Sequence, residues 1–146
     1  MRKNLVRDWM TPNPITIDVK TTLPDAHKLM KESHIRRLPV VDHGKLVGIV
    51  TIGDVREASP SDATSLSIFE LNYLLAQLTV DKIMTRDPLT IQPGANIREA
   101  ARLMLEHKIG GLPVMQDDTL VGIITESDIF RVLAQEPEPA DTASST

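Results

Sequence analysis

The stretch LVGIVTIGD, residues 46–54, returns almost unchanged as LVGIITESD at residues 120–128. Working outward from it, Val6–Val55 aligns without gaps on Val80–Ile129, and 20 of the 50 aligned pairs are identical. Chance does not produce ungapped identity at that level, and an internal repeat sets the architecture of a chain. A unit of about 50 residues is marginally stable alone. We therefore expect the two copies to pack face to face around a pseudo-two-fold axis.

Each copy predicts a short extended piece followed by an amphipathic helix. The extended pieces are Ile15–Asp18 and Leu89–Gln92. Capping-box patterns mark where the helices begin, and they are Thr22 with Asp25 and Asn96 with Glu99. Apolar residues then recur at helical spacing: Leu23, Ala26, Leu29 and Met30 in the first copy, and Ile97, Ala100, Leu103 and Met104 in the second.

Two strands follow in each copy, because β-branched runs flank turn residues. The predicted strands are Leu38–Asp42 and Lys45–Thr51, then Leu112–Gln116 and Thr119–Thr125. The turns lie at His43-Gly44 and Asp117-Asp118, and a second helix starts near Asp54 and near Asp128. The predicted fold class is mixed α+β, with two β-α-β-β-α repeats packed into one module.

The repeats divide the chain into residues 1–58, a connection at 59–79, the second copy at 80–135 and a tail at 136–146. The tail is rich in Pro, Ala, Ser and Thr, so we expect it to be disordered. Residues 58–65 are typical of a loop, and Leu66–Leu78 of a helix that starts with a Ser67-x-x-Glu70 capping box. Its predicted apolar face, which would dock on the module or on a partner, is Leu71, Leu74, Leu75 and Leu78.

The composition excludes several classes of function. The chain has 146 residues, a net charge of −4, 41% hydrophobic residues and no cysteine, which is typical of a soluble globular protein without disulfides or cysteine-bound zinc. An acidic chain with 3% aromatic residues predicts no nucleic-acid partner. We expect no membrane span and no signal peptide, and hence a cytoplasmic location. The four histidines lack H-x-x-x-H spacing, so no dedicated metal site is expected.

The Thr-x-x-Asp ending of each quoted stretch has two interpretations, and one does not exclude the other. Thr51 and Thr125 could cap the second helices, with Asp54 and Asp128 at the third helical position. The same place could bind a ligand, because a helix N-terminus offers free N–H groups to a phosphate. There a hydroxyl can bond a phosphate oxygen, and a carboxylate can accept from two vicinal hydroxyls such as those of a ribose.

Taken together, the motifs resemble a pair of cystathionine-β-synthase (CBS) domains. They are M-T-x-x-P-x-T-I, I-x-x-L-P-V and L-V-G-I-[VI]-T-x-x-D, each present twice and in order across roughly Leu5–Val55 and Thr79–Leu133. The Ser-Pro-Ser-Asp-Ala-Thr stretch and the helix after it are similar to stand-alone bacterial proteins of the acetoin-utilisation type. The resemblance implies a pseudo-symmetric module with two clefts, one per copy. Such clefts bind adenosine derivatives: AMP, ADP, ATP, NAD-type or S-adenosylmethionine-type ligands.

The resemblance also assigns ligand contacts to matching positions. Ribose and phosphate would be held by the Thr-x-x-Asp side chains, Thr51, Asp54, Thr125 and Asp128. The adenine would pack between Ile35 and Ile49 in one cleft, or between Ile109 and Ile123 in the other. The alternative is that these four isoleucines only fill the hydrophobic core. The base would be bordered by Thr11-Pro12 and Thr85-Arg86, and the backbone at Arg37 or Gly111 would complete each cleft. Magnesium would enter only with a polyphosphate ligand.

The copies differ where a phosphate would bind. Arg36-Arg37 stands against Gly110-Gly111, and Arg131 stands against Glu57. Arginine suits bidentate contact with phosphate, and the alternative for the pair is a solvated surface. We therefore predict two sites of unequal affinity.

Three functions are compatible with these sequence features. The first is a regulatory module that binds adenine nucleotide and signals to an effector protein. The second is a ligand-free dimerisation scaffold of the same fold. The third is a hydrolase that uses Asp54 and Asp128, but no nucleophile or base relay accompanies them, so we expect no enzymatic activity. The resemblance implies a homodimer formed through helices, to which Leu66–Leu78 is a candidate contributor.

Overall fold

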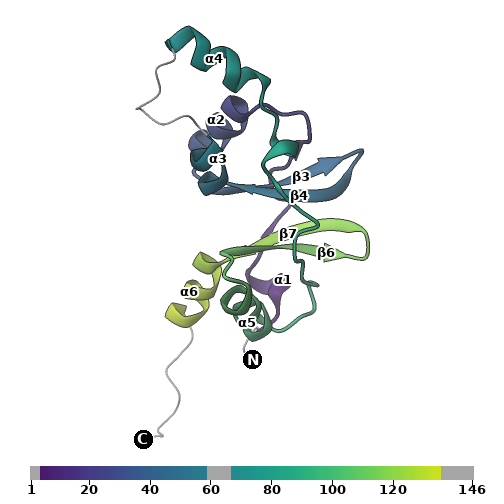
Figure 1. Cartoon of the computed structure of the whole chain (residues 1–146). Coiled ribbons are helices and arrows are strands. Elements are labelled where there is room, and N and C mark those ends of the chain that lie inside the picture. The colour runs from purple at the N-terminus through teal and green to yellow at the C-terminus, as the bar shows by residue number, and fades with distance from the viewer. Residues whose placement is uncertain (1–3, 59–66, 136–146) are drawn as a thin grey trace, which may run out of the picture.

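Two β-sheets occupy the middle of the molecule, and the longer helices lie on their outer sides (Figure 1). The computed structural model describes residues 4–58 and 67–135. The sheets contact each other through β4 (Lys45–Thr51) and β7 (Thr119–Thr125), one from each copy. The predicted mixed α+β module of two repeats is confirmed.

The remaining elements follow the repeat. One sheet has the order β2-β3-β4-β5, with β2 Ile17–Asp18, β3 Arg37–Asp42 and β5 Thr85–Arg86. The other has the order β1-β7-β6, with β1 Thr11–Pro12 and β6 Gly111–Gln116. The helices of the first half are α2 Leu23–Ser33, α3 Ile52–Ala58 and α4 Ile68–Gln77. Those of the second half are α1 Val6–Trp9, α5 Ile97–His107 and α6 Glu126–Gln135, and a 3₁₀ turn spans Val80–Lys82.

The predicted hairpins are confirmed to within one residue, and the first turn has positive φ at both His43 and Gly44. The predicted caps of α2 and α4 also form: the Thr22 hydroxyl accepts from the Asp25 N–H at 3.3 Å, and Ser67 and Glu70 make a reciprocal capping box. Local patterns decide these features because both partners lie within a few residues of each other.

Some local predictions were wrong in detail. The Asn96 side chain accepts from the N–H of Arg98 at 2.8 Å, not from that of Glu99, because an Asn side chain at this position can reach either of two free N–H groups. Ala58, predicted as the start of a loop, is the last residue of α3. The rest of that loop, Leu66 and the tail lie outside the described residues.

The lead segments of the two copies cross over, so that each completes the other copy's half of the molecule. Strand β1 pairs with β7, and β5 pairs with β4. The Val6 N–H donates to the Ala95 carbonyl at 2.9 Å, and Val80 makes the equivalent bond to Thr21 at 2.8 Å. Val6 and Val80 are both 0% exposed, each in the opposite copy's core. The repeats are therefore interlocked as well as stacked.

Two glycines let the crossing strands approach. A Cβ on Gly48 would lie 2.9 Å from the carbonyl oxygen of Thr85, and one on Gly122 would lie equally close to that of Thr11. Real Cβ atoms are not found so near a backbone oxygen, which explains the glycine in both copies of the quoted stretch. Within the described residues, no helix is long and apolar enough to cross a membrane.

We expect Gly122→Ala to lower the free energy of unfolding by about 1–3 kcal/mol, the usual cost of overpacking, because β1 must move off β7. The matched control is Gly53→Ala in α3, whose nearest contact is 3.5 Å away and where alanine favours the helix by about 0.5–1 kcal/mol. Urea denaturation measures both changes. An equal cost for the two variants would contradict the close-approach explanation.

Candidate ligand-binding site

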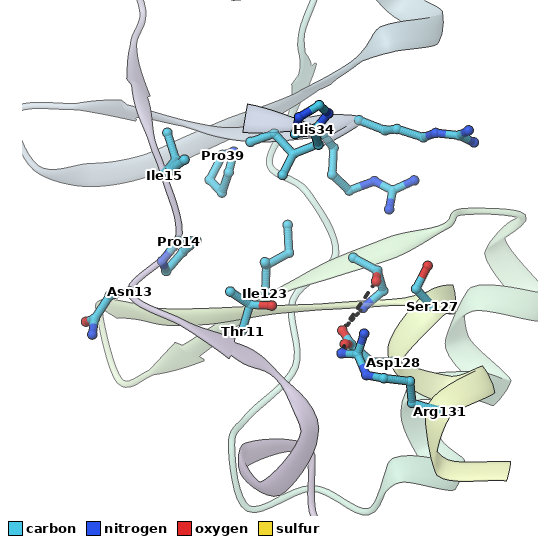
Figure 2. Close-up of a pocket in the computed structure, with 14 residues that line it drawn as sticks. Thr11, Asn13, Pro14, Ile15, His34, Pro39, Ile123, Ser127, Asp128 and Arg131 are labelled. Carbon is cyan, nitrogen blue, oxygen red and sulfur yellow. Dashed lines mark hydrogen bonds and ion pairs between the residues drawn. The ribbon is translucent and has the colours of Figure 1, made fainter. Parts of the chain in front are cut away.

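A cavity of about 420 Å³ opens between the two repeats, within the size range of small-molecule sites. Figure 2 shows its walls. One wall comes from the first copy: His34, Ile35 and Arg36, which connect α2 to β3, and Arg37 and Pro39 at the start of β3. The opposite wall is the end of β7 with the first turns of α6 in the second copy. The segment from Thr11 to Ile15 closes one side, because β1 crosses over to β7.

One end of this cavity is apolar. Pro14 and Ile15 of the lead segment, Pro39 of β3 and Ile123 of β7 gather there in Figure 2. Ile15 is 44% exposed although it is a large apolar side chain, whereas Ile123 is 9% exposed. Proline rings and branched aliphatic side chains around this end suit a mostly apolar group.

The other end of the cavity is polar and carries a positive charge. Ser127, Asp128 and Arg131 lie together on α6 in Figure 2, and Arg36 and Arg37 line the cavity from the first copy. Three arginines therefore line the cavity with one aspartate. Guanidinium groups bind phosphate oxygens with paired hydrogen bonds, so this end can hold an anionic group.

The Thr-x-x-Asp motifs form helix caps in both copies. In the first copy the Thr51 N–H donates to Asp54 Oδ2 at 2.9 Å, and the Asp54 N–H donates to Thr51 Oγ1 at 3.1 Å. In the second copy the Thr125 N–H donates to Asp128 Oδ2 at 2.8 Å. The predicted capping box is confirmed for Thr51 and Asp54, whereas in the second copy only the half made by the Asp128 carboxylate forms. Both helices begin two residues before the aspartate.

The second motif differs from the first in two contacts. Arg131 donates to Asp128 Oδ1, while the Thr125 hydroxyl lies 3.3 Å from Oδ2. The Asp128 side chain is 3% exposed and that of Arg131 is 52% exposed. An ionised carboxylate has about four acceptor positions, so one remains after these three bonds. Asp128 is thus a buried, oriented acceptor at the cavity wall, with a cation attached that its counterpart Asp54 lacks because Glu57 stands at the equivalent position.

Arg37 reaches across the pseudo-two-fold axis to the second copy. Its Nη1 donates to the Gly110 carbonyl at 2.9 Å, the same carbonyl that accepts from the Glu126 N–H at 3.1 Å. A Cβ on Gly111 would lie 2.7 Å from Arg37 Cδ. Burial lowers the pKa of the Arg37 guanidinium, Glu126 raises it, and Arg36 lowers it. Arg37 of the first copy therefore depends on Gly110 and Gly111 of the second, because glycines leave the space that the arginine side chain fills.

The cavity brings together seven of the fourteen residues predicted as ligand contacts. They are Thr11, Ile35, Arg36, Arg37, Ile123, Thr125 and Asp128. Ile35 of the first copy thus shares a cavity with Ile123 of the second, and not with Ile49 as the one-cleft-per-copy expectation implied. Sequence alone did not show this pairing, because it follows from how the two halves pack against each other through β4 and β7.

The other predicted residues lie elsewhere in the molecule. Pro12 pairs with Gly122, and Thr85 pairs with Ile49. Thr51 caps α3, and Gly111 lies under Arg37. Asp54 lines a separate hollow of about 170 Å³, and Ile109 lines one between α5 and α6. Because Asp54 and Asp128 line different hollows, the hydrolase hypothesis gains no geometric support.

The sequence analysis missed several lining residues. They are Asn13, Pro14, Ile15, His34, Pro39 and Ser127. Pro14 and Pro39 are constant positions of the repeated motifs M-T-x-x-P and L-P-V, so the signal that could have found them was present. Arg131 was noted only for its difference from Glu57. Among the residues described, no group of three or more His, Asp or Glu side chains is placed to hold a metal ion.

Comparison with known proteins identifies the family. The CBS domain model matches residues 6–61 and 80–135, so the chain belongs to the CBS domain family and carries two copies. A CBS domain-containing protein of Dictyostelium discoideum is 37% identical over 144 residues, covering 97% of this chain and 99% of that protein. Other curated relatives are longer, and the chain spans 47% and 23% of two from Methanocaldococcus jannaschii.

Solved structures include similar CBS pairs with bound ligands. A putative acetoin utilization protein from Vibrio cholerae matches with a TM-score of 0.73 and 37% identity, over 92% of this chain and 98% of that one, in line with the predicted resemblance. The protein CBSX2 in complex with AMP matches at 0.77 and 31%, and protein MJ0100 with 5-methylthioadenosine and S-adenosyl-L-methionine at 0.75 and 32%. Each of these two covers 91% of this chain, which spans 98% of theirs.

We expect Gly111→Ala to lower the free energy of unfolding by about 1–3 kcal/mol through overpacking, and by clearly less when Arg37→Ala is also present. The reason is that the three atoms nearest to the added methyl group all belong to Arg37. A double-mutant cycle in urea measures the coupling, which for residues in contact is about 0.5–3 kcal/mol. If the glycine change costs the same in both backgrounds, the backbone rather than Arg37 requires the glycine.

Proposed function

We propose that this chain is a regulatory module that binds an adenosine-containing nucleotide in the cavity between its two repeats and signals occupancy to an effector protein. The observation that carries the proposal is a cavity with an apolar end and an arginine-lined end, bounded by both copies. That AMP is bound in CBSX2, and methylthioadenosine and S-adenosyl-L-methionine in MJ0100, supports adenosine as the common part of the ligand.

Each part of such a ligand has a matching surface. The adenine would lie at the apolar end, between Pro39 and Ile123, with Thr11 beside it. A ribose hydroxyl would donate to the free acceptor position of Asp128, which Thr125 and Arg131 hold in place. Phosphate would meet Arg36 and Arg37. Among adenosine ligands we therefore favour AMP, ADP or ATP over S-adenosylmethionine, whose sulfonium cation would face three arginines.

The pseudo-symmetric positions are less suited to an anion. Gly110, Gly111 and Glu57 stand where the cavity has Arg36, Arg37 and Arg131. Glycine thus replaces two of the three arginines, and a glutamate replaces the third. We propose a single strong site at the cavity and a weaker one, or none, across the axis.

Signalling requires that the ligand bind two arrangements of the repeats with different affinity. The bond from Arg37 to the Gly110 carbonyl joins the copies across the axis. A phosphate in the cavity would compete for this guanidinium, because charge-assisted hydrogen bonds to an anion are stronger than those to a neutral carbonyl. Loss of the Arg37–Gly110 bond would remove one hydrogen bond between the repeats and change their relative orientation. An effector protein could then bind one of the two orientations selectively.

The alternative is a ligand-free dimerisation scaffold of the same fold. The observation in its favour is the set of large apolar side chains exposed on the helices, which are Phe69, Tyr73, Leu105, Phe130 and Leu133. Such surfaces mark protein–protein contacts. The two functions are separable by mutation, because none of these five side chains lines the cavity.

We expect AMP, ADP or ATP at about 100 times Kd to stabilise the protein by ~2.7 kcal/mol, and Asp128→Asn to remove most of that gain. Thermal unfolding with each nucleotide, NAD and S-adenosylmethionine measures the effect. Asp54→Asn is the matched control, since it alters the equivalent cap outside the cavity. If none of these ligands shifts the transition, the scaffold alternative stands.

We expect Arg36→Gln to weaken the binding of AMP about 10- to 100-fold while leaving the binding of adenosine unchanged, since one charged hydrogen bond contributes about 1.5–3 kcal/mol. Calorimetric titration gives both affinities. Lys45→Gln, at the tip of the first hairpin, removes the same charge away from the cavity and should change neither affinity. An equal loss for AMP and adenosine would place Arg36 at the base or ribose rather than at the phosphate.

A further inference from the structure

Within the described residues, two segments of the chain run between the halves of the molecule. The first connector, residues 11–16, follows Val6, which lies in the core of the second half, and leads into the first half. The second connector, residues 85–90, follows Val80, which lies in the core of the first half, and leads into the second half. Any turn of one half against the other must therefore bend one connector or both.

The backbone bonds of the two connectors are matched. The Asn13 N–H donates to the Val121 carbonyl of β7 at 3.2 Å, and the Asp87 N–H donates to the Val47 carbonyl of β4 at the same distance. Both donors also have the same backbone conformation, with φ of 49°. A difference in how firmly the connectors are held must therefore come from side chains.

Side chains add further bonds at the second connector. Arg86 Nη2 donates to the Asp81 carbonyl at 2.9 Å, which ties the connector to the turn before it. The Asp81 carboxylate accepts from the Thr79 hydroxyl and from Lys20 Nζ, the latter at 3.2 Å. Since Lys20 lies between β2 and α2, this pair also ties the turn to the first half. The second connector is thus fastened through one chain of polar contacts.

The first connector cannot make the equivalent contacts. Pro12 stands at the position of Arg86, and Gly94 stands at the position of Lys20. Neither proline nor glycine has a side-chain donor. The first connector is therefore held by its backbone bonds without the side-chain contacts that fasten the second.

The less firmly held connector is the one that lines the cavity. Thr11, Asn13, Pro14 and Ile15 all contribute to the cavity wall. Figure 2 shows Pro14 and Ile15 on the side where the chain passes from one half to the other. Arg86 of the second connector lines a separate polar hollow of about 540 Å³ instead. A ligand in the cavity would therefore contact the first connector.

We propose that the two connectors differ in function: the second is the fixed link about which the halves turn, and the first is the link that a ligand in the cavity moves. A ligand shifts such an equilibrium only if it binds one arrangement more tightly, and contact with a movable wall supplies that difference. The part of this proposal that concerns the ligand rests on the proposed function. The difference between the connectors does not, because it follows from bonds of the unliganded chain.

Hydrogen exchange measured by NMR at the Asn13 and Asp87 amides tests the proposal, because exchange reports local opening. Without ligand, the protection factor of Asn13 should be at least about 10-fold lower than that of Asp87. AMP at about 100 times Kd should raise the Asn13 value by up to ~100-fold, since it suppresses opening of the wall that it contacts. The Asp87 value should change far less.

Equal protection of the two amides in the unliganded protein would overturn the proposal whether or not AMP binds. An equal rise at both amides with AMP would also overturn it, because the ligand would then stabilise the whole molecule and not one connector. If calorimetry shows no AMP binding, the proposed function fails for this nucleotide, and the comparison without ligand still decides whether the connectors differ.

Pro12→Arg transfers the fastening contact to the first connector, because an arginine there can donate to the carbonyl five residues before it, as Arg86 does. The protection factor of Asn13 should rise by about 2- to 10-fold, the usual effect of one hydrogen bond. Pro12→Ala is the matched control, since it removes the ring without adding a donor, and it should give no rise. Arg86→Ala should lower the Asp87 value by a similar factor. The same result for both Pro12 variants would contradict the fastening explanation.

A distance measurement tests whether the halves turn. The chain has no cysteine, so spin labels can be placed at Lys45→Cys and Thr119→Cys, which are equivalent exposed positions in the two hairpins. AMP should change the separation of the labels, and Pro12→Arg should reduce that change by at least about half while Pro12→Ala preserves it. Calorimetric titration confirms that each variant is saturated. An unchanged separation in the AMP-saturated protein, or an equal reduction by both Pro12 variants, would overturn the proposal.

Discussion

The crossover of the two lead segments is the constraint on which the rest of this structure depends. Val6 fills the core of the second half and Val80 fills that of the first, both at 0% exposure. Neither copy has a complete core of its own, which suits the marginal stability of units of about 50 residues. The crossover also closes one side of the cavity, because Pro14 and Ile15 follow β1, which pairs with β7.

The differences between the copies carry more functional information than their likeness. The residues that both copies share form the hairpins, the helix caps and the two stacked sheets. The differences concentrate the cations on one side of the axis, where Arg36, Arg37 and Arg131 line a single cavity. Arg37 could not occupy its place without Gly110 and Gly111 opposite. Any side chain at Gly110 or Gly111 would collide with Arg37, so the residues at these positions in the two copies are physically coupled.

Local features were predictable from the sequence because both partners in each interaction lie close together along the chain. Thr51 and Asp54 are three residues apart, and their capping box forms as the spacing indicates. The hairpin strands follow from alternating β-branched residues around turns. Where two local partners compete, prediction was less exact: Asn96 caps α5 through Arg98 and not through Glu99.

The sequence by itself determined the repeat, the order of elements and the family, since these are recorded in motifs that occur twice and in register. Only the tertiary structure decided which motif residues share a cavity. Ile35 and Ile123 share a cavity because the two halves pack against each other through β4 and β7, and Ile109, which matches Ile35 in the repeat, lines a hollow between helices instead. Strand exchange and side-chain packing across the axis involve residues far apart in the chain, and no periodicity records such contacts.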